Sequence, residues 1–399
     1  MTDDFSRATR AAGPGPGDVL GTLLDGIPRT RSEIGSRTGL SRSTVSARVD
    51  ALLRAGLVAP AAHGDSSGGR PPSRVAFNPR ARLAVGIDLG ATHATVAICD
   101  LRNEVLASDT IDIAVADGPE RCLGDAAGLV RGALDGLGVD RSDVAAVGLG
   151  LPAPIDHETG RPQHPPIMPG WHDADVRGIV SALIPATVLV DNDVNVLALG
   201  EHVASWPDVD DLVYVKVSTG IGAGIISGGL LQHGAQGAAG DLGHIVVPWS
   251  PGGVRPADDR RELEDVASGA AIAADLRARG SSARTALEVV DLVRRGDRAA
   301  IESVRQAGRE LGAVLTTVVA LLAPSVIVLG GAVGRAGEHL VAGVREVVYG
   351  SAKPLASRDL RIVPARSDAT AAARGAALLA SRDILSPANL PDLFPHPAR

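Results

Sequence analysis

Cysteine is nearly absent from this chain of 399 residues, which contains only Cys99 and Cys122. Two cysteines exclude a disulfide framework and a cysteine-rich zinc site. Cys99 lies in an apolar run and Cys122 in a predicted amphipathic helix, so we expect both to be reduced structural residues. Lysine is equally scarce, since only Lys216 and Lys353 occur. We attribute that scarcity to genome composition, because alanine and glycine are abundant.

The sequence also lacks a charged leader followed by an apolar segment, so no secretory signal is predicted. Its longest uncharged run, residues 311–334, is interrupted by Pro324 and by Gly330-Gly331. These interruptions favour a buried helix followed by a buried strand over a membrane span. We therefore expect a soluble, cytoplasmic protein with no membrane partner.

Charge is distributed unevenly along the chain. Residues 1–80 carry 11 arginines and 7 acidic residues, whereas the remainder carries 28 basic and 39 acidic residues. A basic segment attached to an acidic body predicts a polyanion as the partner of the N-terminus. The length is sufficient for two or three domains.

Residues 30–56 have the pattern of two short helices joined by a tight turn. Thr30 and Glu33 form a predicted capping box, Gly39 supplies the turn, and Ser41 caps the second helix. The solvent face of that helix carries side chains that contact bases and phosphates, namely Arg42, Ser43, Thr44, Ser46 and Arg48. An ordinary helical hairpin is the alternative, but the segment GLSRSTVS resembles the turn and recognition helix of bacterial repressors.

Residues 57–77 then predict a β-wing. Its tip is a flexible loop that ends in Arg70-Pro71-Pro72, which is suited to placing Arg70 near a minor groove. A plain linker is the alternative interpretation of this loop.

From residue 81 onward, predicted strands and helices alternate, as is typical of an α/β fold. A single helix is predicted at about residues 263–279. Asp88 ends a buried strand and is followed by Gly90 and Thr92, a pattern suited to holding magnesium and a phosphate. Asp193 follows a second strand, at the edge where α/β folds expose their chemistry. The commonest role of an aspartate before a helix is nevertheless that of a helix cap.

A glycine-rich turn, Ser218–Gly224, follows the predicted strand 211–217. Glycines let backbone N–H groups approach an anion closely, with the hydroxyl of Thr219 beside them. The pattern indicates a phosphate clamp. A plain β-hairpin turn is the alternative, because short glycine motifs have many false positives.

Together these motifs resemble the ROK family of repressors, open reading frames and sugar kinases over residues 82–382. In chain order they are Asp88–Thr92, Asp191–Asn195, Ser218–Gly224, Gly240–His244, Leu263-Glu264 with Ala267–Gly269, and Gly330-Gly331. The resemblance implies a two-lobed, actin-like ATPase (ribonuclease H-like) sugar-kinase fold. With the N-terminal helix-turn-helix included, the whole chain resembles the xylose- and N-acetylglucosamine-type repressors of that family.

The resemblance also implies roles for individual residues. Sugar contacts are expected from Asn192, Asp193, Asp241, His244 and Glu264, with Asp193 as the general base if the protein is a kinase. Nucleotide and phosphate contacts are expected from Asp88, Gly90, Thr92, Thr219, Gly220, Gly222, Gly330 and Gly331.

Three departures from the family pattern qualify these roles. Ala91 and His93 replace a glycine and a lysine of the first phosphate loop. Residues 251–262 lack the three cysteines of the family's zinc site, so zinc is not expected and no metal ligands are assigned. Ile167-Met168 stands where an asparagine usually contacts the sugar.

The expected organisation has five parts. They are a disordered N-terminus (1–16), a winged helix-turn-helix (17–78), a small lobe (82–190), a large lobe whose closing helix returns to the small lobe (191–384), and a loose Pro-rich tail (385–399). We expect a sugar-responsive repressor that binds operator DNA and a sugar or sugar phosphate, as a homodimer or a dimer of dimers, with no certain cofactor.

Two alternatives stay open. The first is an active, glucokinase-like sugar kinase that uses Mg-ATP and also binds DNA. The second is a repressor controlled by a protein partner in place of a sugar.

Overall fold

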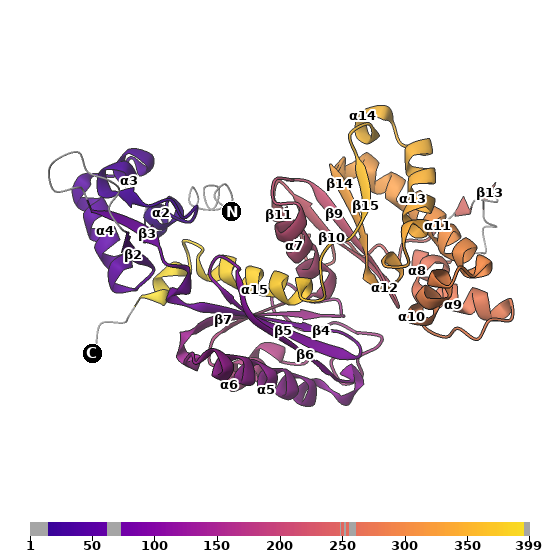
Figure 1. Ribbon diagram of the computed structural model, residues 1–399, viewed down its shortest axis with the longest axis horizontal. Coiled ribbons are helices and arrows are strands. Elements are labelled where there is room, and N and C mark those ends of the chain that lie inside the picture. Colours follow the sequence, from indigo (N-terminus) through magenta and orange to yellow (C-terminus); the bar gives the residue numbers. More distant parts are fainter. Residues whose placement is uncertain (1–14, 62–72, 248, 251–252, 255–260, 395–399) are drawn as a thin grey trace. The chain divides into compact units, whose positions relative to one another are not determined.

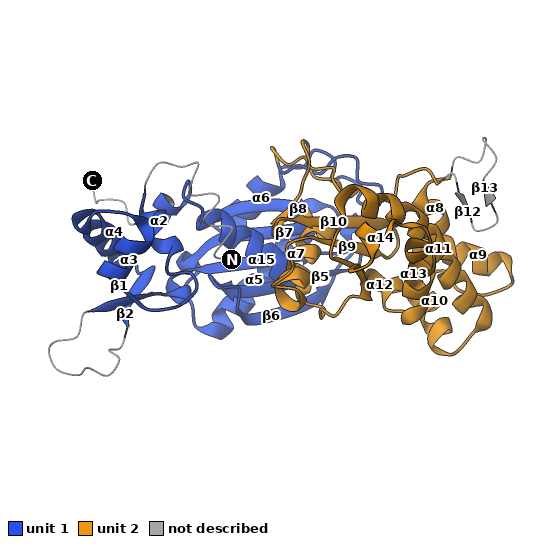
Figure 2. Ribbon diagram, turned by 90° about the horizontal axis from the view of Figure 1, so that it is seen from above, with its two compact units in different colours: residues 1–153, 160–191, 373–399 blue, residues 154–159, 192–372 orange. Residues whose placement is uncertain are grey.

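The computed structural model describes residues 15–61, 73–247, 249–250, 253–254 and 261–394. The chain divides into two compact units (Figure 2). Unit 1 comprises residues 1–153, 160–191 and 373–399, and unit 2 comprises residues 154–159 and 192–372. The C-terminal segment therefore returns to the unit in which the chain begins.

Unit 1 starts with a winged helix-turn-helix. Its helices are α2 (Pro16–Gly21), α3 (Arg31–Thr38) and α4 (Arg42–Arg54), and its antiparallel sheet has the order β1 (Arg29–Thr30), β3 (Arg74–Phe77), β2 (Val58–Ala61). The predicted caps are confirmed: the Thr30 hydroxyl accepts the N–H of Glu33, and the Thr30 N–H donates to the Glu33 carboxylate at 2.7 Å. Gly39 takes the left-handed conformation (φ 71°) that the tight turn requires.

The main sheet of unit 1 has the strand order β6-β5-β4-β7-β8 (Figure 1). Its strands are β4 (Leu83–Leu89), β5 (His93–Asp100), β6 (Val105–Asp112), β7 (Val144–Leu151) and β8 (Thr187–Asn192). Helices α5 (Pro119–Leu137) and α6 (Val176–Leu183) lie on one face and α15 (Ala371–Ile384) on the other. Gly86 and Gly148 let α15 approach closely, because an added Cβ would lie 1.7 Å and 1.9 Å from its backbone oxygens.

The sheet of unit 2 has the order β11-β10-β9-β14-β15. Its strands are β9 (Leu212–Val217), β10 (Ile221–Ser227), β11 (Leu230–Leu231), β14 (Val326–Gly330) and β15 (Arg361–Pro364). β9 to β11 are antiparallel, whereas β14 and β15 run parallel to β9. Numbered within each sheet, both units thus have the strand order 3-2-1-4-5. A short hairpin, β12 (Trp249–Ser250) and β13 (Gly253–Val254), is separate.

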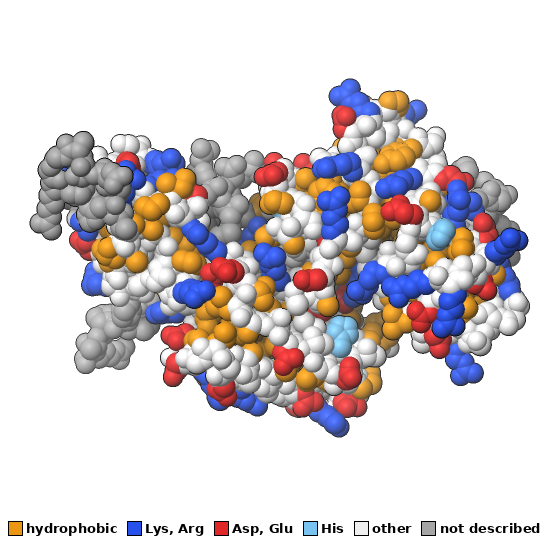
Figure 3. All heavy atoms as spheres, in the orientation of Figure 1, with side chains coloured by type: hydrophobic (Ala, Val, Ile, Leu, Met, Phe, Trp, Pro, Cys, Tyr) orange, Lys and Arg blue, Asp and Glu red, His pale blue; other side chains and the backbone are white. Residues whose placement is uncertain are grey.

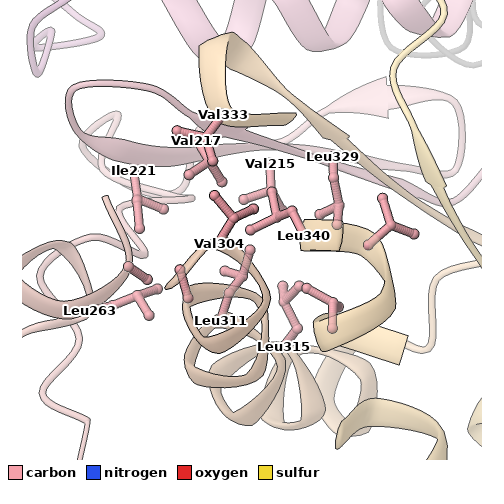
Figure 4. Packing of buried hydrophobic residues seen from close by; sticks show 14 of the residues in the cluster. Val215, Val217, Ile221, Leu263, Val304, Leu311, Leu315, Leu329, Val333 and Leu340 are labelled. Carbon is pink, nitrogen blue, oxygen red and sulfur yellow. The ribbon is translucent and has the colours of Figure 1, made fainter. Parts of the chain in front are cut away.

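Helices cover both faces of the unit 2 sheet. Helix α7 (Asp193–Ser205) packs on β9 and β10. The other helices are α8 (Leu263–Ala267), α9 (Gly269–Ala278), α10 (Ala286–Arg294), α11 (Arg298–Leu322), α12 (Gly331–Gly334), α13 (Glu338–Ser351) and α14 (Pro354–Ser357). Figure 4 shows the core on the face opposite α7, which contains Val215 of the sheet, Leu311 of α11 and Leu340 of α13.

The structure corrects two expectations. A single helix was expected over residues 263–279, but the chain breaks at Ser268, which is extended and whose hydroxyl caps α9 by accepting the N–H of Ala271 at 3.1 Å. The tail from residue 385 was expected to be loose, but Leu385, Leu390 and Leu393 are buried in the same core as Val19. Residues 395–399 lie outside the described part of the chain. Of the N-terminus expected to be disordered (1–16), residues 1–14 also lie outside it, whereas Pro16 already begins α2.

Two observations concern the molecular surface. On the face shown in Figure 3, acidic and basic side chains are interspersed, with exposed apolar side chains between them. Among the described helices, none combines the length and apolarity that a membrane span requires.

Candidate functional site

The candidate DNA-reading helix is α4, which the sequence positions through its N-cap. The Ser41 hydroxyl accepts the N–H of Thr44 at 3.2 Å and also contacts the Ser43 and Thr44 hydroxyls. Arg42 and Ser43 are exposed, and Thr44 and Ser46 are partly exposed. The first turn of α4 therefore presents a guanidinium and hydroxyl groups to solvent, as base and phosphate contacts require.

Arg48 does not belong to this exposed set, which corrects the sequence-based expectation. Its guanidinium forms an ion pair with Asp18 at 3.1 Å, and its side chain is only 14% exposed. The reason lies in helical spacing, since Val45, Arg48, Val49 and Leu52 follow the i, i+3, i+4, i+7 pattern of the buried stripe. Arg48 thus joins α4 to α2. Arg70, the expected wing-tip residue, lies outside the described residues.

In unit 2, two of the expected sugar residues, Asn192 and Asp193, lie at the N-terminus of α7. Asn192, not Asp193, is the helix cap, because its Oδ1 accepts the N–H of Val194 at 2.8 Å. Asp193 lies in the first turn and is 5% exposed. Its Oδ2 accepts a hydrogen bond from Lys216 Nζ at 2.5 Å. Asp193 is therefore a buried carboxylate with a cationic partner that sequence reasoning missed.

Glu264 joins two loops of the expected site. Its Oε2 accepts the N–H of Ile221 at 3.0 Å, so it fixes the end of the glycine-rich turn. Gly220 and Gly243 make room for it, because an added Cβ would lie 2.7 Å and 2.9 Å from that oxygen. The side chain thus fixes the turn between β9 and β10 to the loop that precedes α8. Asp241, in that same loop, is exposed.

His244 has a second unforeseen partner. Its Nδ1 lies 2.6 Å from Glu262 Oε2; His244 is exposed and Glu262 is partly exposed. The hydrogen bond to the Glu262 carboxylate raises the pKa of His244 above its usual value, against a smaller opposing effect of burial. The raised pKa widens the pH range over which the ring is protonated, and a protonated ring donates from both nitrogens. The proximity of Glu262 follows from an isolated bridge between Val246 and Glu262.

The expected nucleotide residues of unit 2 lie at the ends of β9, β10 and β14. Thr219 is exposed in the turn between β9 and β10, and Gly222 opposes Lys216 across the sheet. Gly331 has φ +81°, and an added Cβ at Gly330 would lie 1.8 Å from the Tyr214 hydroxyl oxygen. Both glycines are therefore sterically required at this turn. Burial of Tyr214 raises the pKa of its hydroxyl, which stays protonated.

The first phosphate loop belongs to unit 1 and connects β4 to β5. Asp88 Oδ2 lies 3.9 Å from His93 Nε2. The His93 ring covers Gly90, since an added Cβ there would lie 2.4 Å from its Cε1, and the Gly90 N–H donates to the His93 carbonyl at 2.8 Å. Thr92 is exposed. The side chain that replaces the family's lysine thus lies against the loop backbone.

Comparison with known proteins adds independent findings. The ROK family model matches residues 84–383, and the MarR family model matches residues 16–66. A putative xylose repressor from Caldicellulosiruptor sp. (strain Rt8B.4) is 26% identical over 345 residues, which cover 83% of this chain and 86% of that protein.

Solved structures give the same result. A ROK family transcriptional regulator, homologous to the E. coli MLC protein, is 25% identical with a TM-score of 0.79 and covers 95% of this chain and 97% of its own. A ROK family glucokinase from Streptomyces griseus, in complex with glucose and AMPPNP, is 26% identical with a TM-score of 0.62. The match covers 75% of this chain and 99% of the glucokinase chain. These matches confirm the expected fold, a winged helix-turn-helix followed by an actin-like, sugar-kinase-like domain, and add that the helix-turn-helix is MarR-like. The chain therefore belongs to the ROK family.

Proposed function

We propose that this protein is a sugar-responsive, DNA-binding transcriptional repressor. The observation that carries the proposal is the presence, in one chain, of an exposed reading helix and a separate cluster of sugar-type hydrogen-bonding groups. The reading helix is α4 with Arg42 and Ser43. The sugar-type groups belong to unit 2: Asn192 and Asp193 start α7, and Asp241, Glu262 and Glu264 lie near His244.

A neutral sugar fits this cluster better than a sugar phosphate does. The carboxylates of Asp193, Asp241, Glu262 and Glu264 outnumber the two basic partners, Lys216 and His244. A phosphate would add two negative charges where acidic groups already prevail, and close like charges repel strongly in a partly buried site. Hydroxyl groups, in contrast, can donate to these carboxylates.

Sugar kinase activity is the second candidate, because Asp193 occupies the position of the expected general base. The residues that would hold Mg-ATP do not fit it in the first loop. A phosphate that approached the Gly90 backbone near Asp88 would have to displace the His93 ring. Positioning of the phosphates and electrostatic stabilisation dominate phosphoryl transfer, so an obstructed loop is a severe loss. We propose that Asp193 acts as a hydrogen-bond acceptor for a sugar hydroxyl and that the protein does not turn over ATP.

The test is a thermal-shift screen of the full chain against monosaccharides and amino sugars, with and without Mg-ATP. A sugar at ten times its Kd should raise apparent stability by about 1.4 kcal/mol. The same sugar should change binding of the protein to its genomic upstream region in a gel-shift assay. A screen without any stabilising sugar, or a chain that does not bind that DNA, would contradict the proposal.

Two further properties follow from the proposal. We expect the repressor to act as a homodimer or a dimer of dimers on a two-fold-symmetric operator, which light scattering of the complex can measure. We also expect no stoichiometric zinc, because residues 251–262 contain no cysteine. Elemental analysis of the purified protein checks this.

A further inference from the structure

Lys216 is a charged residue to which the family resemblance assigns no role. In β9, Val213, Val215 and Val217 belong to the hydrophobic core of unit 2. Because side chains alternate along a strand, Lys216 projects from the opposite face, the one that α7 covers. The alternation therefore directs a cation towards the N-terminus of α7.

The neighbours of Lys216 in the sheet are both glycines. Gly222 of β10 and Gly330 of β14 oppose it on its two sides. The space over these glycines is filled from the same face, by the Tyr214 hydroxyl at Gly330 and by Val194 of α7 at Gly222. The same two glycines are among the expected phosphate and adenosine contacts, which puts Lys216 between them.

The ammonium group of Lys216 forms an ion pair with Asp193, which is one of the expected sugar contacts. Lys216 Nζ lies 2.5 Å from Asp193 Oδ2, with the Lys216 side chain 27% exposed and the Asp193 side chain 7% exposed. A charge-assisted hydrogen bond between partly desolvated groups is stronger and more directional than a surface ion pair. It fixes the orientation of the carboxylate.

We propose that Lys216 is a positioning residue of the sugar site, a role that rests on the proposed function. By binding Oδ2, it orients the Asp193 carboxylate so that Oδ1 accepts a hydrogen bond from one sugar hydroxyl. It also balances the negative charge of Asp193, which suits a neutral ligand. A carboxylate held in this way serves to bind a hydroxyl and does not take up its proton in a transfer reaction.

The test is a double-mutant cycle on sugar affinity, measured by calorimetry with the sugar that gives the largest thermal shift. The proteins are wild type, Lys216→Met, Asp193→Asn and the double variant. If Lys216 acts through Asp193, Lys216→Met should weaken binding about tenfold or more in wild type and threefold or less in the Asp193→Asn background. Lys216→Arg should restore most of the affinity. Lys353→Met, at the exposed second lysine, is the matched control and should bind as wild type does.

If Lys216→Met weakens sugar binding equally in the wild-type and Asp193→Asn backgrounds, or in neither, the role proposed for Lys216 is wrong. Sugar binding by the wild type would still support the proposed function. A wild-type protein that binds no sugar would contradict the proposed function itself and this role with it. If Lys216→Met does not fold, Lys216→Ala takes its place in the cycle, since it too removes the donor to Asp193.

Discussion

At the scale of single residues, Asp193 distinguishes a sensor from an enzyme. In a kinase, Asp193→Asn would abolish turnover, because an amide cannot accept the hydroxyl proton. In a sensor it removes one charge-assisted hydrogen bond, and we expect sugar binding to weaken by about 1.5–3 kcal/mol. We predict the second outcome, with no sugar-dependent ADP release by the wild type in a coupled assay. Wild-type turnover on the order of 1 s⁻¹ that disappears in the variant would show the protein to be a kinase.

The pair formed by His244 and Glu262 predicts a pH dependence. The pKa of His244 is raised in the folded state, so protonation of His244 contributes to the stability of the fold. This contribution is fully present below the unfolded pKa of about 6.5. It is lost as pH rises through the folded pKa. Glu262→Gln should lower the melting temperature at pH about 6 and have a smaller effect at pH about 9. An NMR titration of the His244 ring should show its pKa fall in the variant. An unchanged pKa would mean that Glu262 is not the cause.

The residues that sequence reasoning missed have a physical explanation. Asn192 and Asp193 follow a strand and precede a helix, so their position near a strand end is a local property. The partners Lys216 and Glu262 come from distant segments that only the folded sheet and one isolated bridge bring near. Alternation of apolar residues predicts that Val213, Val215 and Val217 lie in a strand. No local pattern predicts that Lys216, on the other face of that strand, meets Asp193 of α7.

At the scale of elements, local signals were sufficient where backbone chemistry decides the structure. The capping box of Thr30 and Glu33, the cap at Ser41 and the left-handed Gly39 all act within a few residues. Ser268 carried a similar signal, a cap before a new helix, which the apolar pattern on both sides concealed. Arg48 shows the limit of reasoning by residue type, because its helical position, next to Val49, decides its burial.

The same helix gives a prediction about DNA. Replacing Arg42 with alanine should cost about 1–3 kcal/mol of specific operator binding if it contacts a base. Arg54→Ala is the matched control, because Arg54 is exposed in the last turn of the same helix, away from the capped end. Fluorescence anisotropy with operator DNA and with unrelated DNA separates base-specific binding from general attraction to the phosphates. Equal losses for both variants would indicate a general charge effect and remove Arg42 from base recognition.

At the scale of the whole molecule, a single buried core in unit 1 joins segments from both ends of the chain. Val19 and Leu20 of the winged helix-turn-helix, Ala84 of the main sheet and Leu390 of the tail share it. An apolar core of this kind transmits the loss of one side chain to all the elements that line it. The DNA-binding part of the chain is therefore expected to depend on residues near the C-terminus.

The last prediction tests this dependence through Leu390→Ala. Leu390 is 1% exposed, and removal of a buried leucine side chain costs about 2–5 kcal/mol. Because the lost contacts belong to unit 1, hydrogen exchange should accelerate in α2 and α4 while β9 and α11 keep their protection. Leu355→Ala, at a leucine that is 84% exposed on α14, should change stability by less than about 0.5 kcal/mol. Unchanged exchange in α2 and α4 would mean that the tail does not support the winged helix-turn-helix.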